Sequence, residues 1–285
     1  MYSVSESFLN QIKADNREFS IKLTFNSSTE LSGTTIQDVS VDELVNSTDV
    51  LTLGCACSNK ITVNLLNAPT DIDYANSYFV ATVSLKLGEM PTVYEDIPLG
   101  KFYVSTAQTS TDFKKLTITA YDGFSKMVDP YNATVGENTT LQAVYDDLKA
   151  QLYTNCGITL KAKTLPEYAL VFPYVKNITY QKAIGYVAGC LGGVARFDRL
   201  GELEIVTYTD TNIVIGRDVQ YMDGFKRLTD KTLSITSIST GTKDNVIVRG
   251  DGANGTAISF ENPYITDTMA DSIYADFNNF TYTPC

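Results

Sequence analysis

The residues of this chain that could do chemistry are its carboxylates, its five cysteines and its serines paired with lysines, because histidine is absent. Without histidine there is no Ser-His-Asp or Cys-His relay, no imidazole base and no histidine-ligated zinc. Carboxylate chemistry, serine–lysine chemistry and a metal site built from cysteine alone stay open.

The cysteines do not have the spacing of a metal site. Cys55 and Cys57 form a C-x-C pair, which lacks the C-x-x-C spacing of zinc knuckles and has no second pair nearby. Cys156, Cys190 and Cys285 are scattered. We interpret all five as free or buried thiols of a protein assembled in a reducing compartment, and we expect no cofactor.

The acidic and glycine-rich segments also have ordinary interpretations. Asp146 and Asp147 lie on a predicted helix beside Lys149, which indicates a solvated face. Asp244, Asp251 and Asp267 lack calcium-loop spacing. The stretches at 189–193 and 250–255 lack the order of a phosphate loop, so we interpret them as a helix end and a hairpin turn. Paired carboxylates for sugar hydrolysis stay open, because such acids converge only in space.

Composition predicts a folded, acidic protein of two or three domains. The 285 residues are 44% hydrophobic and 19% charged, with 22 basic residues against 33 acidic ones, a net charge of −11. Phosphate contacts need clustered lysine and arginine, and no basic patch interleaved with aromatics is evident, so we expect no specific grip on nucleic acid. We expect neither a signal peptide nor a membrane helix.

The pattern of apolar residues predicts an α+β protein that is predominantly antiparallel β. Alternation at 19–25 and 114–122 is typical of half-buried strands. Further strands are predicted at 34–41, 51–58, 60–67, 77–87, 92–100, 101–108, 211–216, 231–240, 244–251 and 256–263, with a hairpin at 194–206. Short strands at this spacing indicate a sandwich or barrel. Helices are predicted at 3–17, 139–153, 179–193 and 266–280.

Five pieces of the sequence, taken in order, point to a family. They are LTLGCACSNKITVNL at 51–65, IPLGKFYVSTAQTSTDFKKLTITAYDGFSKMVDPY at 97–131, TTLQAVYDDL at 139–148, ITYQKAIGYVAGCLGGVARFDRLGELEI at 178–205 and ISFENPYITDTMADSIYADF at 258–277. This ordered set resembles the tail hub, or baseplate hub and tail-tip, proteins of long-tailed bacteriophages and phage tail-like particles.

The resemblance implies two β-barrel-like tube domains, at 1–128 and 208–285, that flank an α/β insert at 129–207. It implies a homotrimer whose six tube domains close a ring joining a hexameric tail tube to a threefold spike, fibre or tail tip. Partners would be tail tube and distal tail proteins, a spike or tail-fibre protein and a tape measure protein. DNA would pass the lumen without specific binding, eased by the negative charge. The location would be the virion, after assembly in the bacterial host cytoplasm.

The resemblance gives structural roles to nine residues and no enzymatic role to any. IPLGKFYV and KLTITAYD would be paired strands of a tube wall, with Leu99, Phe102, Leu116 and Ile118 in its core. The other family-motif positions are Leu53, Gly54, Gly100, Tyr121 and Asp122. Relatives continue beyond the segment that ends here at Cys285. We therefore expect the second tube domain to be incomplete or closed by a partner.

Two other classes of function stay open. A glycan-binding, adhesin-like β-module would be a monomer that binds cell-wall sugars, although the absence of tryptophan disfavours it. A carboxylate-based glycoside or peptide hydrolase would need two acidic residues whose single replacement abolishes turnover without changing assembly.

Overall fold

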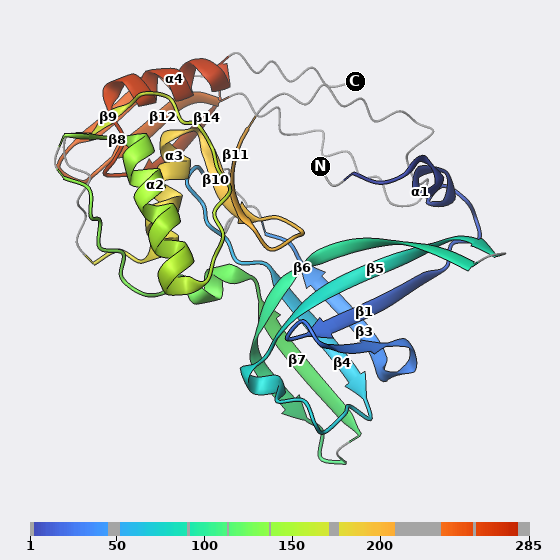
Figure 1. Cartoon of the computed structure of the whole chain (residues 1–285). Helices are drawn as coiled ribbons and strands as arrows, with labels where there is room; N and C mark the ends of the chain where they lie inside the picture. The colour runs from blue at the N-terminus through green and yellow to red at the C-terminus, as the bar shows by residue number, and fades with distance from the viewer. Residues whose placement is uncertain are drawn as a thin grey trace.

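The computed structural model describes residues 3–44, 52–89, 92–112, 114–136, 138–170, 177–208, 235–252 and 255–278. These residues form mostly antiparallel β-structure with few helices. A long-stranded sheet lies at one end, and helices with short sheets lie at the other (Figure 1). The predicted predominance of antiparallel β is therefore confirmed.

The large sheet has seven strands in the order β2-β1-β5-β6-β7-β4-β3, all antiparallel. Its apolar alternation places Leu116, Ile118 and Ala120 of β7 on the buried face. The strands are β1 (Phe19–Phe25), β2 (Thr29–Ser32), β3 (Ile36–Asp42), β4 (Lys60–Leu66), β5 (Tyr78–Glu89), β6 (Thr92–Thr109) and β7 (Lys115–Tyr121).

The two edge strands of this sheet, β2 and β3, follow one another in the chain. Only the 3-10 turn η1 (Gly33–Thr35) separates β2 from β3, so the sheet curls until its first and last strands meet at that turn. No ladder pairs β2 with β3 among the described residues, so this sheet is open. The barrel-like form of the predicted domains stays a prediction.

The prediction of two strands at 92–100 and 101–108 was wrong, because β6 is one strand of 18 residues. Its register against β5 shifts at residues 98–100, where a bulge absorbs the irregularity. Gly100 there has φ +143°, and a Cβ on it would lie 3.0 Å from the Phe102 ring. Glycine thus allows the strand to continue through the bulge.

The other end of the molecule contains three helices and a set of short strands among the described residues. They are β8 (Thr139–Thr140), α2 (Leu141–Gln151), β9 (Ala169–Leu170), α3 (Tyr180–Cys190), β10 (Gly193–Phe197), β11 (Leu203–Thr207), β12 (Ile235–Gly241), β13 (Val246–Gly250), β14 (Thr256–Glu261) and α4 (Asp267–Asn278). The β10–β11 hairpin was predicted. The parallel pairing of β14 with β12 was not.

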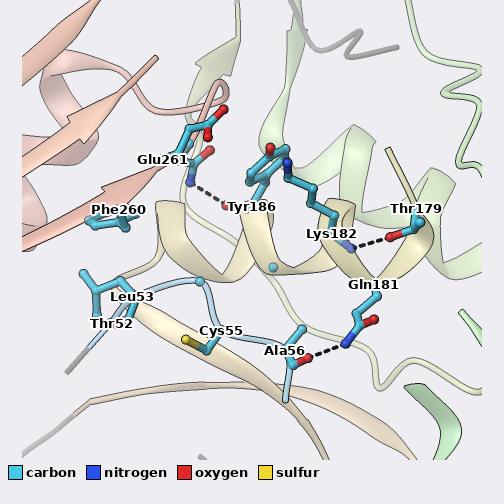
Figure 2. Close-up of a pocket in the computed structure, with 13 residues that line it drawn as sticks. Thr52, Leu53, Cys55, Ala56, Thr179, Gln181, Lys182, Tyr186, Phe260 and Glu261 are labelled. Carbon is cyan, nitrogen blue, oxygen red and sulfur yellow. Dashed lines mark hydrogen bonds between the residues drawn. The ribbon is translucent and has the colours of Figure 1, made fainter. Parts of the chain in front are cut away.

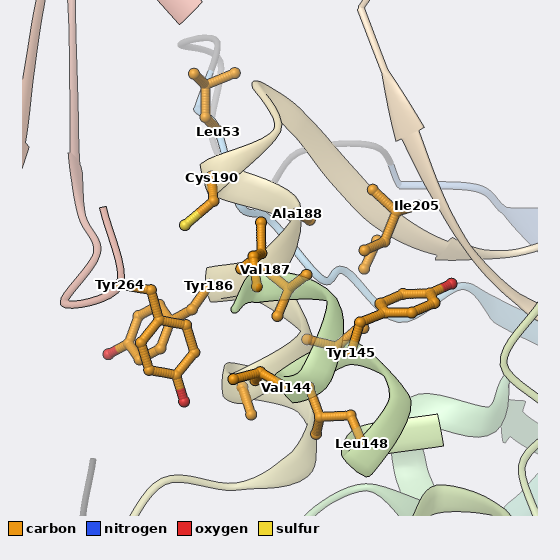
Figure 3. Packing of buried hydrophobic residues seen from close by; sticks show 14 of the residues in the cluster. Leu53, Val144, Tyr145, Leu148, Tyr186, Val187, Ala188, Cys190, Ile205 and Tyr264 are labelled. Carbon is orange, nitrogen blue, oxygen red and sulfur yellow. The ribbon is translucent and has the colours of Figure 1, made fainter. Parts of the chain in front are cut away.

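Two hydrophobic cores support these two regions. One lies within the seven-stranded sheet. The second is continuous from α2 and α3 through the β10–β11 hairpin to β12, β14 and α4. Figure 3 shows Val144 and Leu148 of α2 beside Val187 of α3, with Tyr186 near Tyr264. The domain boundaries at 128 and 207 stay a prediction, but residues on both sides of the second share this core.

Several predicted bounds change. The helix expected at 3–17 is only α1 (Glu6–Gln11), capped by the Ser5 side chain; Gln11 and Arg17 side chains then hydrogen-bond the backbone of a turn. The strand expected at 211–216 lies outside the described residues, as do the first four residues of the one at 231–240 and the last two of the helix at 266–280. The short β2, β8 and β9 were missed.

Replacing Ile118 by alanine tests the sheet core. Ile118 is fully buried, so removing its side-chain atoms and leaving a cavity should lower the free energy of unfolding by about 2–5 kcal/mol. Val128→Ala is the control, since Val128 is 63% exposed, and its effect should stay within about 0.5 kcal/mol. Urea unfolding measures both. Equal effects would contradict the assignment of Ile118 to the core.

Candidate functional site

Residues 52–58, here called the strap, join the two ends of the molecule. They lie between β3 and β4 in the chain, but they contact α3 and β10 at the other end (Figure 2). The Gly54 amide donates to the Gly193 carbonyl over 2.8 Å, and the Ala195 amide donates to the Cys55 carbonyl over 2.8 Å. The strap thus lies parallel to β10, with one bridge at Ala56 and Ala195.

The strand predicted over 51–58 was therefore wrong for the described residues 52–58. Leu53 is buried, as the apolar alternation predicts. No strand forms, because Gly54 has φ +72° and interrupts the extended backbone. Leu53 belongs to the core of the α/β end and not to the core of the seven-stranded sheet.

Glycines allow the strap to lie directly on α3. A Cβ on Gly185 would lie 2.5 Å from the Gly54 carbonyl oxygen, and one on Gly54 would lie 2.7 Å from the Gly185 oxygen. Both distances are shorter than a van der Waals contact, so neither position has room for a side chain. Gln181, one turn earlier in α3, donates from Nε2 to the Ala56 carbonyl over 2.6 Å.

Asn262 connects a third element to the same helix. Its side chain is 1% exposed, and Nδ2 donates to the Tyr186 carbonyl of α3 over 2.8 Å. Its Oδ1 accepts from the Tyr264 amide over 3.0 Å, and its own amide donates to the Gly241 carbonyl. A Cβ on Gly189 would lie 2.9 Å from Nδ2. Strap, α3 and the end of β14 thus meet at one junction.

A cavity of about 370 Å³ opens at this junction. It is lined by strap residues 52–56, by Thr179, Gln181, Lys182, Gly185 and Tyr186, and by Phe260, Glu261 and Asn262 (Figure 2). The Lys182 ammonium lies 5.5 Å from the centre of the Tyr186 ring, and a hydrogen bond to Tyr186 raises the pKa of Lys182.

The junction offers little for nucleophilic or metal chemistry. Burial raises the pKa of the Cys57 thiol to about 11, and the neighbouring Cys55 adds to this rise, so Cys57 stays protonated at neutral pH. Cys55, Cys57, Cys156 and Cys190 form no disulfide within the described part of the chain. In the described ranges, no three histidine, cysteine or acidic residues are grouped as metal ligands.

Asp122 fixes the other end of the strap. This carboxylate is 2% exposed and follows β7 directly. It accepts hydrogen bonds from the Ser58 hydroxyl and the Asn59 amide, both over 2.8 Å, and from the Phe124 amide over 3.2 Å. Burial raises the pKa of the carboxyl, and these three hydrogen bonds oppose the rise.

Comparisons with known proteins address the fold. No family model and no curated protein sequence matches the chain. The structure is similar to that of the tail protein from Neisseria meningitidis MC58, with a TM-score of 0.53, 12% identity and coverage of 90% of this chain and 74% of that one. It is also similar to that of prophage tail protein gp18 from Listeria monocytogenes EGD-e, with a TM-score of 0.50, 12% identity and coverage of 92% of this chain and 78% of that one.

The chain has the fold of these two tail proteins. At this level of identity the likeness concerns the fold alone. No helix in the described parts of this tail-protein fold is long and apolar enough to cross a bilayer.

The tail-protein fold distributes the nine family-motif residues over two places. Leu53, Gly54 and Asp122 lie at the strap and its anchor. Phe102, Leu116 and Ile118 are buried in the seven-stranded sheet, and Leu99 is half-buried in the bulge that contains Gly100. Tyr121 is half-buried on the opposite face.

Sequence reasoning missed three features of this region. Gly189 lies in the last turn of α3, as predicted for a helix end, but its close approach to Asn262 was not predicted. Asn262 itself gave no signal, because a buried asparagine has no spacing pattern. The outer face of the sheet also brings Tyr78, Lys101 and Tyr103 together, which the alternation within single strands could not show.

Gly185→Ala tests the close approach of strap and α3. Alanine favours a helix more than glycine does, yet the new Cβ would force the backbone at Gly54 to move. We expect the free energy of unfolding to fall by about 1–3 kcal/mol. Gly136→Ala is the matched control, because its Cβ would meet no atom within 4 Å. A Gly185→Ala protein as stable as Gly136→Ala would contradict this packing.

The pH dependence of stability tests the buried Asp122. The pKa of Asp122 is higher in the folded protein than in the unfolded chain. The stability that this difference contributes is therefore fully present below the pKa of the unfolded state, and it is lost as the pH rises through the pKa of the folded state. Asp122→Asn cannot titrate. The stability advantage of the wild type over Asp122→Asn should therefore shrink as the pH rises from below the ordinary aspartate pKa, about 3.9, to above the raised native pKa. Urea unfolding across this range measures it, and a constant or growing advantage would refute the assignment.

Proposed function

We propose that the chain is a structural, non-enzymatic component of a phage tail or tail-like particle. It would form a trimeric, pseudo-sixfold hub that joins the hexameric tail tube to a threefold spike, fibre or tail tip. The observation that carries this proposal is the tail-protein fold, which matches over about nine-tenths of the chain.

The open seven-stranded sheet supports an assembling role. Its edge strands β2 and β3 have ladder partners on one side only among the described residues. An edge strand exposes backbone donors and acceptors that can pair with another chain. Three copies related by a heterologous contact can close such edges into a ring.

The charge of the chain supports a channel through which DNA passes. With a net charge of −11, the surface as a whole repels phosphate, and a ring with this charge would let DNA slide without being held. The proposed partners are tail tube and distal tail proteins on one side and a spike or tail-fibre protein on the other. A tape measure protein would lie in the lumen.

In this proposal, residues 1–128 and 208–285 supply tube domains and residues 129–207 the insert. The strap would then be a brace between wall and insert, since it is held to β10 and α3 at one end and to Asp122 at the other. The hub would be located in the virion after assembly in the host cytoplasm.

The mass and symmetry of the purified protein test this proposal. Light scattering over a dilution series, followed by two-dimensional electron-microscope class averages, should show a trimer that forms a ring of six similar lobes around a hole. If the protein needs the tail tube as a template, the same ring should form once tail tube protein is added. A monomer at all concentrations, with and without tube protein, would refute the hub.

A further inference from the structure

A cleft of about 590 Å³ lies between the seven-stranded sheet and the tip of the β10–β11 hairpin. On the sheet side it is lined by Ile97 and Leu99 of β6 and by Glu43 and Leu44, which follow β3. Residues 196–200 line it on the hairpin side, where the hairpin reaches toward β6 (Figure 1). The cleft shares no lining residue with the cavity at the strap junction, so it is a separate feature of the surface.

The cleft lies where β6 continues past the end of its neighbour β7. The ladder between these two strands covers only the C-terminal part of β6. Beside Ile97 and Leu99, β6 therefore has a ladder partner on one side only among the described residues. Pro98 has no N–H, and the bulge at 98–100 further interrupts this edge, so an added strand would pair poorly with it. The side chains of the cleft thus determine what it can bind.

Apolar side chains line both sides of the cleft. Ile97 and Leu99 are half-buried on the sheet side, and Phe197 is buried on the hairpin side. Leu44 and Leu200 are exposed, although Leu200 lies in a hairpin turn, where polar residues and glycine are usual. Single exposed leucines are ordinary on a protein surface, but two that line one cleft form a patch for an apolar partner.

The ion pairs of the cleft leave its cations more exposed than its anions. The Lys161 ammonium lies 2.7 Å from the Asp198 carboxylate and 2.8 Å from that of Glu204. The Arg196 guanidinium lies 2.9 Å from Glu204. The two carboxylate side chains are 14% and 20% exposed, whereas those of Lys161 and Arg196 are 36% and 47% exposed. A ligand that enters from this side therefore meets mainly positive charge, on a chain whose net charge is −11.

Arg199 is the cation best placed to bind a ligand. Its guanidinium lies 4.0 Å from the Glu43 carboxylate, which is longer than a hydrogen bond, and both side chains are exposed. Such an ion pair contributes little to stability. A ligand carboxylate would compete with Glu43 through the paired hydrogen bonds that arginine forms with carboxylates. Leu44 and Leu200 follow Glu43 and Arg199 directly in the chain, so the cleft offers apolar contact and charge together.

We propose that this cleft is a docking site for a short segment of a partner protein, in which apolar side chains are flanked by a carboxylate. The apolar side chains would cover Leu44 and Leu200, and the carboxylate would bind Arg199. Complementarity of charge favours this partner over a basic segment. Nucleic acid is disfavoured, because carboxylates already hold Lys161 and Arg196, and phosphate contacts need clustered cations. The inference goes beyond the proposed hub and does not depend on the ring.

Selection of peptides tests the proposal. Yeast-displayed random peptides are sorted against the fluorescently labelled full-length protein, and the dissociation constants of the enriched peptides are measured. We expect these peptides to carry apolar residues beside aspartate or glutamate. They should bind a chain with Leu44→Asp and Leu200→Asp at least about tenfold more weakly, since acids then face the apolar side chains. The matched control is Leu9→Asp combined with Tyr153→Asp, because Leu9 and Leu44 are both 49% exposed and neither control residue lines the cleft.

Exchange of charge makes the test specific. Arg199→Glu should weaken binding of the same peptide about fivefold or more, and replacing the acid of the peptide by lysine should restore its binding to this variant. Lys13→Glu changes the charge of the chain equally at an exposed position away from the cleft and should bind like the wild type. Thermal unfolding confirms that each variant folds.

Three results would overturn the inference. The first is a selection that enriches no peptide, and the second is a set of peptides that bind the cleft variants and the controls equally. In the third, light scattering shows self-association that the Leu44→Asp and Leu200→Asp changes abolish, which would assign the cleft to a second copy of the chain. The hub proposal would survive the first two results if rings form. Peptide binding as expected by a protein that never forms rings would refute the hub and leave the docking site.

Discussion

The contact between Gly54 in the strap and Gly185 in α3 is the constraint on which the rest of this structure depends. The two backbones approach so closely that neither position has room for a Cβ. This approach allows the strap to add its backbone to β10 and to bury Leu53 in the core of the α/β end. A chain segment that belongs in sequence to the sheet is thereby built into the other end of the molecule.

Asp122 connects the strap to the end of β7 in the seven-stranded sheet. The strap ends at Ser58, and both Ser58 and the next residue, Asn59, donate to the Asp122 carboxylate that follows β7. The next residues, Gly123 and Phe124, pack against Phe197 of β10; the Phe124 and Phe197 rings meet edge-on with centres 4.9 Å apart. Strap and β7 thus reach β10 from two directions. A buried carboxylate suits this position, because its two oxygens accept three hydrogen bonds from two separate parts of the chain.

Sequence reasoning recovered what local periodicity controls. Alternation located β1 and β7 closely, and apolar stripes located α2 and α3 within a few residues. It failed where tertiary contacts decide. The alternation around Leu53 predicts a strand, but Gly54 and the close helix turn it into a strap. The break predicted at Gly100 is only a bulge, because pairing with β5 resumes after it. Asn262 could not be predicted, since its partners come from distant segments.

The same argument explains why the tyrosines on the outer face of the seven-stranded sheet were not predicted to form a cluster. Tyr78, Tyr103 and Tyr121 are far apart in sequence and become neighbours only when the register of β5, β6 and β7 is known. The core face of each strand is set by its own residues, whereas the surface composition depends on pairing.

Amide hydrogen exchange at Gly54 and Ala195 tests most directly whether the strap makes the two ends one cooperative unit. These amides donate across the junction, to Gly193 and Cys55. If the junction opens only with the whole fold, both should exchange as slowly as the amides of the central β5–β6 ladder. Exchange as fast as that of exposed turns, with the ladder still protected, would show that the ends separate independently and would contradict this account.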